Sequence, residues 1–137
     1  MDMIHIVCSS DANYIMPTGV MIKSVCMSNR DESINFHVIV DESVSGWQRK
    51  QLEEVVEGHD RHHVLFHLVD GKLFSDFPQL GITKTYITKA TYYRLLFTDI
   101  FGTDIHKLLY LDGDMIITGS LRDLWETNLD GYAVGAV

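Results

Sequence analysis

The sequence predicts an α/β fold with a mainly parallel sheet. Short apolar segments at residues 4–8, 36–40 and 64–69 alternate with segments of helical character, which is typical of βαβ units. Polar turns follow the first of these segments and a later one at residues 107–111. Parallel sheets bind ligands beyond the carboxyl ends of their strands, so we expect a site at that edge.

The first half of the chain is expected to form two helices between its three strands. Pro17 lies near the start of the first helix, where a missing N–H is tolerated, and the helical pattern runs to Met27. Ser45 and Gln48 have the spacing of a capping box. They predict a second helix that runs toward Gly58.

The second half of the chain is less regular. Residues 73–81 show no period and are expected to be irregular. Residues 90–101 carry apolar side chains at helical spacing and predict a helix. Residues 107–111 predict another strand, which is followed by Asp-Gly-Asp and by the apolar residues 115–118.

Length and charge restrict the function classes. The 137 residues contain no linker, so we expect one domain over residues 1–137. Asp and Glu number 19 against 11 Lys and Arg, a net charge of −8, which argues against nucleic-acid binding. No apolar run reaches the ~20 residues of a membrane helix, and the first residues do not resemble a secretory signal. Cys8 and Cys26 form no CxxC motif and are expected to be buried thiols in a reducing cytoplasm.

Asp112 and Asp114 flank Gly113 directly after the last predicted strand. Carboxylates so close repel each other unless a cation or water separates them. Mg²⁺ and Mn²⁺ prefer oxygen ligands and often bind through carboxylates and substrate phosphates, and the glycine would let a ligand approach the backbone. Asp-Gly between apolar runs is also a strong β-hairpin signal, so a hairpin stays open as the alternative.

Two further polar features also allow two interpretations each. Asp11 and Asn13 follow the first strand, where they would cap a helix or recognise the amide edge of a flat heterocycle. Arg94 lies in the apolar residues 92–97, where it would be solvated or would pair with a carboxylate or phosphate.

Four histidines gather near the third strand, but no cysteine accompanies them at a zinc-finger spacing. We therefore expect an exposed turn that leads into the strand rather than a metal site. These histidines are His59, His62, His63 and His67. Trp47 and Trp125 are expected to be packing residues rather than a platform for a sugar.

Several segments, in this order, resemble the family-8 glycosyltransferases, which include bacterial lipopolysaccharide galactosyl- and glucosyltransferases and glycogenin. They are Ile-Val-Cys-Ser-Ser-Asp-Ala-Asn-Tyr at 6–14, Ala-Thr-Tyr-Tyr-Arg-Leu at 90–95 and Leu-Leu-Tyr-Leu-Asp-Gly-Asp at 108–114, then Gly-Ser-Leu at 119–121. An Asp-x-Asp motif alone is weak evidence, whereas this combination is specific.

The resemblance implies a Rossmann-like GT-A fold, the fold of nucleotide-diphospho-sugar transferases, with a UDP-sugar as donor and Mn²⁺ or Mg²⁺ as cofactor. By position, Asp112 and Asp114 would hold the metal, Asp112 would also lie near the ribose, and Gly113 would offer its backbone to the nucleotide.

The resemblance also implies which residues would contact the rest of the donor. Tyr14 would flank the base, and Arg94 would lie near the donor phosphate or sugar. The uracil would be bordered by Ser9, Asp11 and Asn13.

The implied activity is that of a retaining hexosyltransferase that moves glucose or galactose from a UDP-sugar to a glycan, lipid-linked or protein-linked acceptor. A dication would stabilise the negative charge that grows on the leaving diphosphate. No residue of the chain is assignable as catalytic.

The resemblance also implies that the chain is truncated, with the C-terminal half of the fold missing. Family members are usually about twice as long and carry a His metal ligand in an HxxGxxKPW-like segment that does not occur here. The alternative function is therefore a UDP-sugar-binding fragment without turnover. Peripheral membrane association would depend on the missing region.

Overall fold

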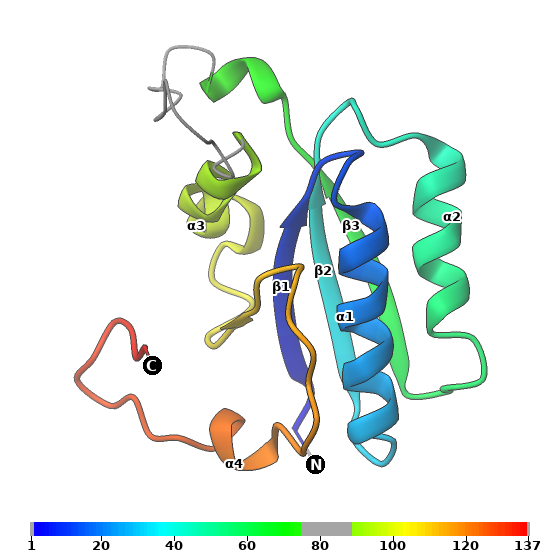
Figure 1. Cartoon of the computed structure of the whole chain (residues 1–137). Coiled ribbons are helices and arrows are strands. Elements are labelled where there is room, and N and C mark those ends of the chain that lie inside the picture. The colour runs from blue at the N-terminus through cyan, green and yellow to red at the C-terminus, as the bar shows by residue number, and fades with distance from the viewer. Residues whose placement is uncertain (1, 75–88, 137) are drawn as a thin grey trace.

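A computed structural model describes residues 2–74 and 89–136 (Figure 1). Four strands form one sheet in the order β3-β2-β1-β4, and every pair in it is parallel. The strands are β1 (Ile4–Ser10), β2 (Ile34–Val40), β3 (His62–Leu68) and β4 (Leu109–Tyr110). The predicted α/β class with a parallel sheet is confirmed.

Helices α1 (Ile15–Ser28) and α2 (Gly46–Val55) pack side by side on one face of the sheet (Figure 1). The capping box is present at the start of α2, because Gln48 N donates to Ser45 Oγ over 3.2 Å and Ser45 N donates to Gln48 Oε1 over 3.0 Å. The first helix begins slightly before Pro17, as a proline in the first turn permits.

The opposite face is covered by two short helical segments that are consecutive in the chain. The 3₁₀ helix η2 (Lys89–Leu96) leads directly into α3 (Phe97–Phe101), so the helix predicted over residues 90–101 is mostly of 3₁₀ type. A further 3₁₀ helix, η1 (Gly71–Phe74), follows β3, and residues 75–81 of the segment expected to be irregular lie outside the described residues. The short helix α4 is formed by Arg122–Trp125.

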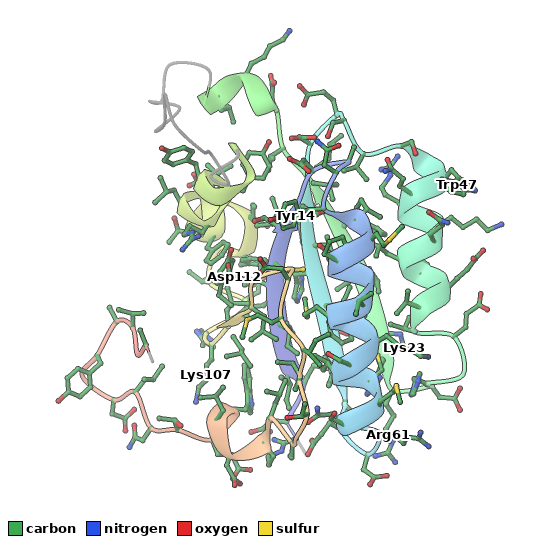
Figure 2. All side chains as sticks on the ribbon, viewed as in Figure 1. Tyr14, Lys23, Trp47, Arg61, Lys107 and Asp112 are labelled. Atoms are coloured by element: carbon green, nitrogen blue, oxygen red, sulfur yellow. The ribbon has the colours of Figure 1, made fainter. Side chains whose placement is uncertain are left out.

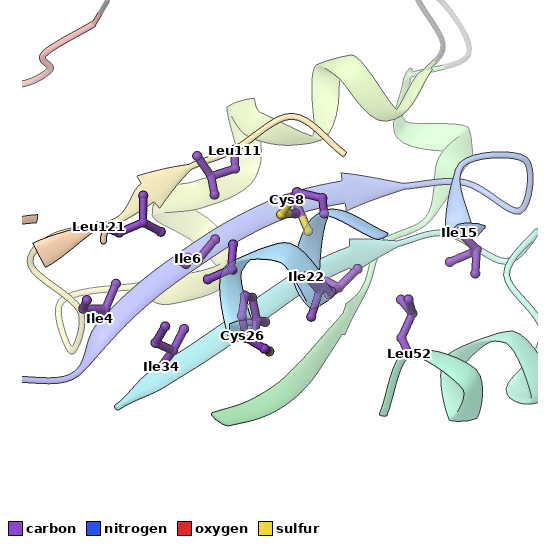
Figure 3. Close-up of a cluster of buried hydrophobic side chains, with 14 of the residues drawn as sticks. Ile4, Ile6, Cys8, Ile15, Ile22, Cys26, Ile34, Leu52, Leu111 and Leu121 are labelled. Carbon is purple, nitrogen blue, oxygen red and sulfur yellow. The ribbon is translucent and has the colours of Figure 1, made fainter. Parts of the chain in front are cut away.

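Successive residues of a strand face opposite sides, and this alternation produces two cores. Ile4, Ile6 and Cys8 of β1 pack against α1, as Figure 3 shows. Val7 packs on the other side with Tyr93 and Phe101. Both cysteines are buried free thiols, and burial raises the pKa of Cys8 to about 12 and that of Cys26 to about 11.

The β-hairpin alternative for residues 107–118 is wrong. β4 pairs in parallel with β1, and residues 115–118 form no strand. Instead Ile117 N donates to Ser24 Oγ over 2.9 Å, and Ser28 Oγ donates to Ile117 O over 3.0 Å. Side chains of α1 therefore provide the hydrogen bonds that a hairpin partner would have provided.

Two expectations for histidine and tryptophan need correction. The histidines do not form a simple exposed turn, because His62 is buried and its Nε2 lies 3.0 Å from Asn29 O, and His67 Nε2 lies 2.9 Å from His37 Nδ1. Trp125 is a packing residue, whereas Trp47 is 69% exposed.

In the described ranges 2–74 and 89–136, no helix combines the length and the apolar character needed to span a membrane.

Candidate functional site

The order of the strands creates a switch point beside β1. The chain builds β2 and β3 on one side of β1 and then returns to place β4 on the other side. Loops that leave the carboxyl ends of strands at such a point form a crevice where α/β proteins bind ligands. Two loops do so here. We call residues 11–14, after β1, the first turn, and residues 112–114, after β4, the DGD turn.

The side chain of Asp11 organises the first turn. Its Oδ1 accepts the backbone N–H of Asn13 over 2.9 Å and that of Tyr14 over 3.1 Å. Asp11 therefore closes the turn that precedes α1. The helix-cap interpretation is wrong, because the N-cap residue of α1 is Tyr14 and no side chain forms a cap hydrogen bond there. Asn13 is exposed, while Tyr14 is half-buried at the start of α1 (Figure 2). The roles of Asp11, Asn13 and Tyr14 toward a base remain predictions.

The DGD turn presents its two carboxylates to solvent. Asp112, labelled in Figure 2, and Asp114 are exposed, whereas Gly113 between them is buried. A Cβ at residue 113 would lie 2.6 Å from Thr18 Oγ1, so only glycine allows the turn to contact α1 this closely. The glycine is thus required by packing against the helix, a reason that the sequence did not show. Its contact with a nucleotide remains a prediction.

Tyr110 of β4 is the residue on which three predicted site residues converge. Burial raises the pKa of its hydroxyl, a hydrogen bond with Ser9 and the charge of Arg94 lower it, and the charge and hydrogen bond of Asp112 raise it. The guanidinium carbon of Arg94 lies 4.9 Å from the centroid of the Tyr110 ring. Residues from β1, η2 and the DGD turn therefore meet around one aromatic ring.

Arg94 lies against an aromatic ring, and its predicted pairing with a carboxylate or phosphate stays a prediction. Its residue is exposed on η2, yet its charged end stacks on Tyr110 rather than extending away from the sheet. A guanidinium held on an aromatic ring that Asp112 also contacts is suited to bind an anionic group.

Sequence reasoning missed a second polar contact at this edge. Tyr93 is completely buried, and its hydroxyl donates to Asp41 Oδ2 over 2.5 Å. Burial, then the hydrogen bond to Asp41 and the charges of Asp41, Glu42 and Asp11, raise the pKa of Tyr93. Asp41 follows β2 as directly as Asp11 follows β1. An aspartate directly after a predicted strand was therefore the feature of the sequence that could have identified Asp41.

Comparison with known proteins places this geometry in a family. The family model described as Glycosyl transferase family 8 matches residues 5–137. Glycosyltransferase GlyF of Streptococcus pneumoniae serotype 4 is 33% identical over 135 residues, which cover 96% of this chain and 31% of GlyF. The lipopolysaccharide 1,3-galactosyltransferase of Salmonella typhimurium is 29% identical over 136 residues, 99% of this chain and 39% of that protein.

A solved structure shows the same fold. The galactosyltransferase LgtC, in complex with donor and acceptor sugar analogues, superposes with a TM-score of 0.80 at 32% identity, over 92% of this chain and 43% of LgtC. The predicted GT-A fold is confirmed over that part. The chain spans less than half the length of each of these relatives. Because the family model matches residues 5–137, the chain belongs to glycosyl transferase family 8.

Proposed function

We propose that residues 1–137 form the donor-binding domain of a retaining hexosyltransferase that uses a UDP-sugar and a divalent cation. The observation that carries the proposal is the convergence of Ser9, Arg94 and Asp112 on Tyr110 at the switch point beside β1. Charged groups of both signs at such a crevice suit a diphosphate and its cation.

The donor atoms of the DGD turn fit a hard dication. Asp112 and Asp114 provide exposed carboxylate oxygens, the ligand type that Mn²⁺ and Mg²⁺ prefer, and such ions commonly bind through two carboxylates and substrate phosphates. When bound, the ion would stabilise negative charge on the leaving diphosphate.

The remaining residues would bind and orient the donor. Arg94 brings a permanent positive charge to the phosphate region, and its stacking on Tyr110 limits its freedom. The first turn would border the uracil, with Tyr14 at its side. The sugar would pass, with retention at the anomeric carbon, to a hydroxyl of a glycan or of a lipid- or protein-linked acceptor.

A second candidate is a chain that binds the UDP-sugar without transferring the sugar. The observation that favours it is the coverage of the relatives, since this chain corresponds to 31% of GlyF and 43% of LgtC. The two candidates share the donor site and differ only in turnover.

Calorimetric titration of UDP with and without Mn²⁺ tests the proposal. We expect binding that requires Mn²⁺ and that is lost in Asp114→Asn, while the circular dichroism spectrum stays unchanged. Asp60→Asn is the matched control, because Asp60 is an exposed aspartate in the loop before β3, at the opposite edge of the sheet. UDP affinity that is equal in Asp114→Asn and in the wild type would refute the metal assignment.

Turnover is then measured separately, as UDP released from UDP-glucose and from UDP-galactose in the presence of Mn²⁺, with water or an added glycan hydroxyl as the acceptor of the sugar. Release supports the transferase. Binding of both donors without release supports the second candidate.

A further inference from the structure

A hydrogen-bonded network outside the predicted site residues holds the middle of the first turn. Ala12 donates its backbone N–H to Ser43 Oγ over 3.1 Å, and its carbonyl accepts a hydrogen bond from Gln48 Nε2, also over 3.1 Å. Both polar backbone groups of Ala12 are therefore bound by side chains from the segment that follows β2. The position of the first turn thus depends on residues more than 30 positions away in the chain.

Asp41 fixes the direction of these hydrogen bonds. Its Oδ1 accepts the backbone N–H of Ser43 over 2.9 Å and the hydroxyl of Ser43 over 2.5 Å. Because an ionised carboxylate only accepts hydrogen bonds, the hydroxyl of Ser43 must donate to Asp41. Its lone pairs then remain to accept the N–H of Ala12.

Tyr93 holds Asp41 from the other side. Its hydroxyl donates to Asp41 Oδ2 over 2.5 Å inside the core between the sheet and η2. A tyrosine hydroxyl is protonated at neutral pH, and burial raises the pKa of Tyr93 further, so the hydroxyl is the donor. One carboxylate therefore connects η2, which carries Arg94, with the first turn.

We infer that Asp41 and Tyr93 are positioning residues that hold the first turn in the conformation that receives the nucleoside part of the donor. The inference rests on the proposed function for its ligand. Neither side chain has to touch the nucleotide, because both act through Ser43 and Ala12.

The network predicts how strongly each substitution should weaken the hold on the first turn. Asp41→Ala removes the carboxylate oxygens that accept hydrogen bonds from Ser43 and Tyr93. Asp41→Asn preserves the connections, since its amide oxygen can accept from Ser43 while its NH₂ group donates to the hydroxyl oxygen of Tyr93. Tyr93→Phe removes one hydrogen bond and leaves the link to Ser43. Ser43→Ala removes the hydroxyl that accepts the N–H of Ala12. Because Ser43 is exposed, this variant should fold even if Asp41→Ala does not.

The test compares two probes in the presence of Mn²⁺, UDP and inorganic pyrophosphate. We expect Asp41→Ala and Ser43→Ala to weaken UDP about tenfold, Tyr93→Phe about threefold and Asp41→Asn less than about twofold. Pyrophosphate affinity should change less than about twofold in all four variants, because pyrophosphate does not need the first turn. Phe101→Leu is the matched control, since Phe101 belongs to the same buried cluster as Tyr93 and should leave UDP affinity unchanged.

Two results of these affinity measurements would overturn the inference. One is an equal loss of UDP and pyrophosphate affinity in Asp41→Ala and Ser43→Ala. The other is a loss of UDP affinity in Phe101→Leu as large as in those two variants.

Amide hydrogen exchange without ligand separates this inference from the proposed function. Exchange at Ala12 should become faster in Asp41→Ala and Ser43→Ala, relative to Ile6 in β1, and should not change in Phe101→Leu. Unchanged exchange at Ala12 in the first two variants refutes the network, whatever the wild type does with UDP. A wild type that binds no UDP refutes the proposed function and the nucleotide part of this inference.

Discussion

Gly113 packs so closely against Thr18 that a Cβ on the glycine would lie 2.6 Å from Thr18 Oγ1. This contact connects the DGD turn with the first half of α1. The threonine hydroxyl is buried and has no hydrogen-bond partner among the described residues, so its position is set by packing rather than by polar contacts. The spacing between the two carboxylates of the turn and α1 is therefore fixed by these two residues.

The contact predicts a substitution and its suppressor. Gly113→Ala should lower the free energy of unfolding by about 1–3 kcal/mol, because the new methyl group overlaps Thr18 Oγ1. In the double variant Thr18→Ala and Gly113→Ala, the nearest remaining side-chain atom is the Cβ of residue 18, at an ordinary contact distance of 3.7 Å. The double variant should therefore recover part of the loss, and urea unfolding of the four members of the cycle measures the coupling.

Thr18→Val is the matched control for this cycle. Valine places a methyl group where Oγ1 stands, so the overlap with the methyl group introduced by Gly113→Ala persists and the loss should not be recovered. Additive effects of Gly113→Ala and Thr18→Ala would show that the turn moves away from the helix instead of pressing on it.

A row of three neighbouring histidine rings on the sheet should make the stability of the chain depend on pH. His5 Nδ1 lies 2.9 Å from His37 Nε2, and His37 Nδ1 lies 2.9 Å from His67 Nε2, so a row of rings crosses three strands. Phe101 packs edge-on against both His37 and His67. Burial, then the charges of His67 and His5, lower the pKa of His37 to about 4. Burial also lowers the pKa of His5 and His67.

The row should make the folded chain less stable in mild acid. Below the ordinary pKa of 6.5 the unfolded chain binds protons that folded His37 does not bind, so the free energy of unfolding falls with falling pH. The loss from His37 should reach up to about 3 kcal/mol near pH 4 and level off below it. Urea unfolding at pH values from 7.5 to 4, in steps of about 0.5 pH units, measures the slope of the free energy of unfolding against pH.

His37→Gln should flatten that slope, whereas His63→Gln, an exposed position on the same sheet, should leave it unchanged. The prediction fails if the wild type and His37→Gln lose stability in parallel as the pH falls.

Local signals in the sequence were sufficient for much of the fold. The capping box of Ser45 and Gln48 is decided within four residues, and the apolar strand segments are decided by their own composition. The Asp-Gly pair at residues 112–113 was an equally local signal, yet the β-hairpin that it indicated does not form. Ser24 and Ser28 of α1 hold Ile117 beside the helix and prevent a hairpin.

Long-range contacts explain what the sequence could not show. The hydrogen bond from Tyr93 to Asp41 spans 52 positions, and the contact between His37 and His67 spans 30. Neither pair forms a motif in the linear sequence, because the register of parallel strands and the packing of η2 create both. The predicted aspartates, by contrast, are marked by their place directly after strands.

Asp11 permits a last prediction that separates its two roles. Its Oδ1 accepts two backbone N–H groups of the first turn, a role that Asn can also perform and Ala cannot. Asp11→Ala should cost about 1–3 kcal/mol of unfolding free energy, because two backbone N–H groups lose a charged acceptor, and Asp11→Asn should cost less because its amide oxygen still accepts them. If Asp11 also borders the uracil, Asp11→Asn should weaken UDP while leaving pyrophosphate affinity in Mn²⁺ unchanged, because the turn persists and only the polar edge that meets the base has changed. Calorimetry with both probes measures this. UDP affinity equal to that of the wild type in Asp11→Asn, together with a loss in Asp11→Ala, would limit the role of Asp11 to holding the first turn.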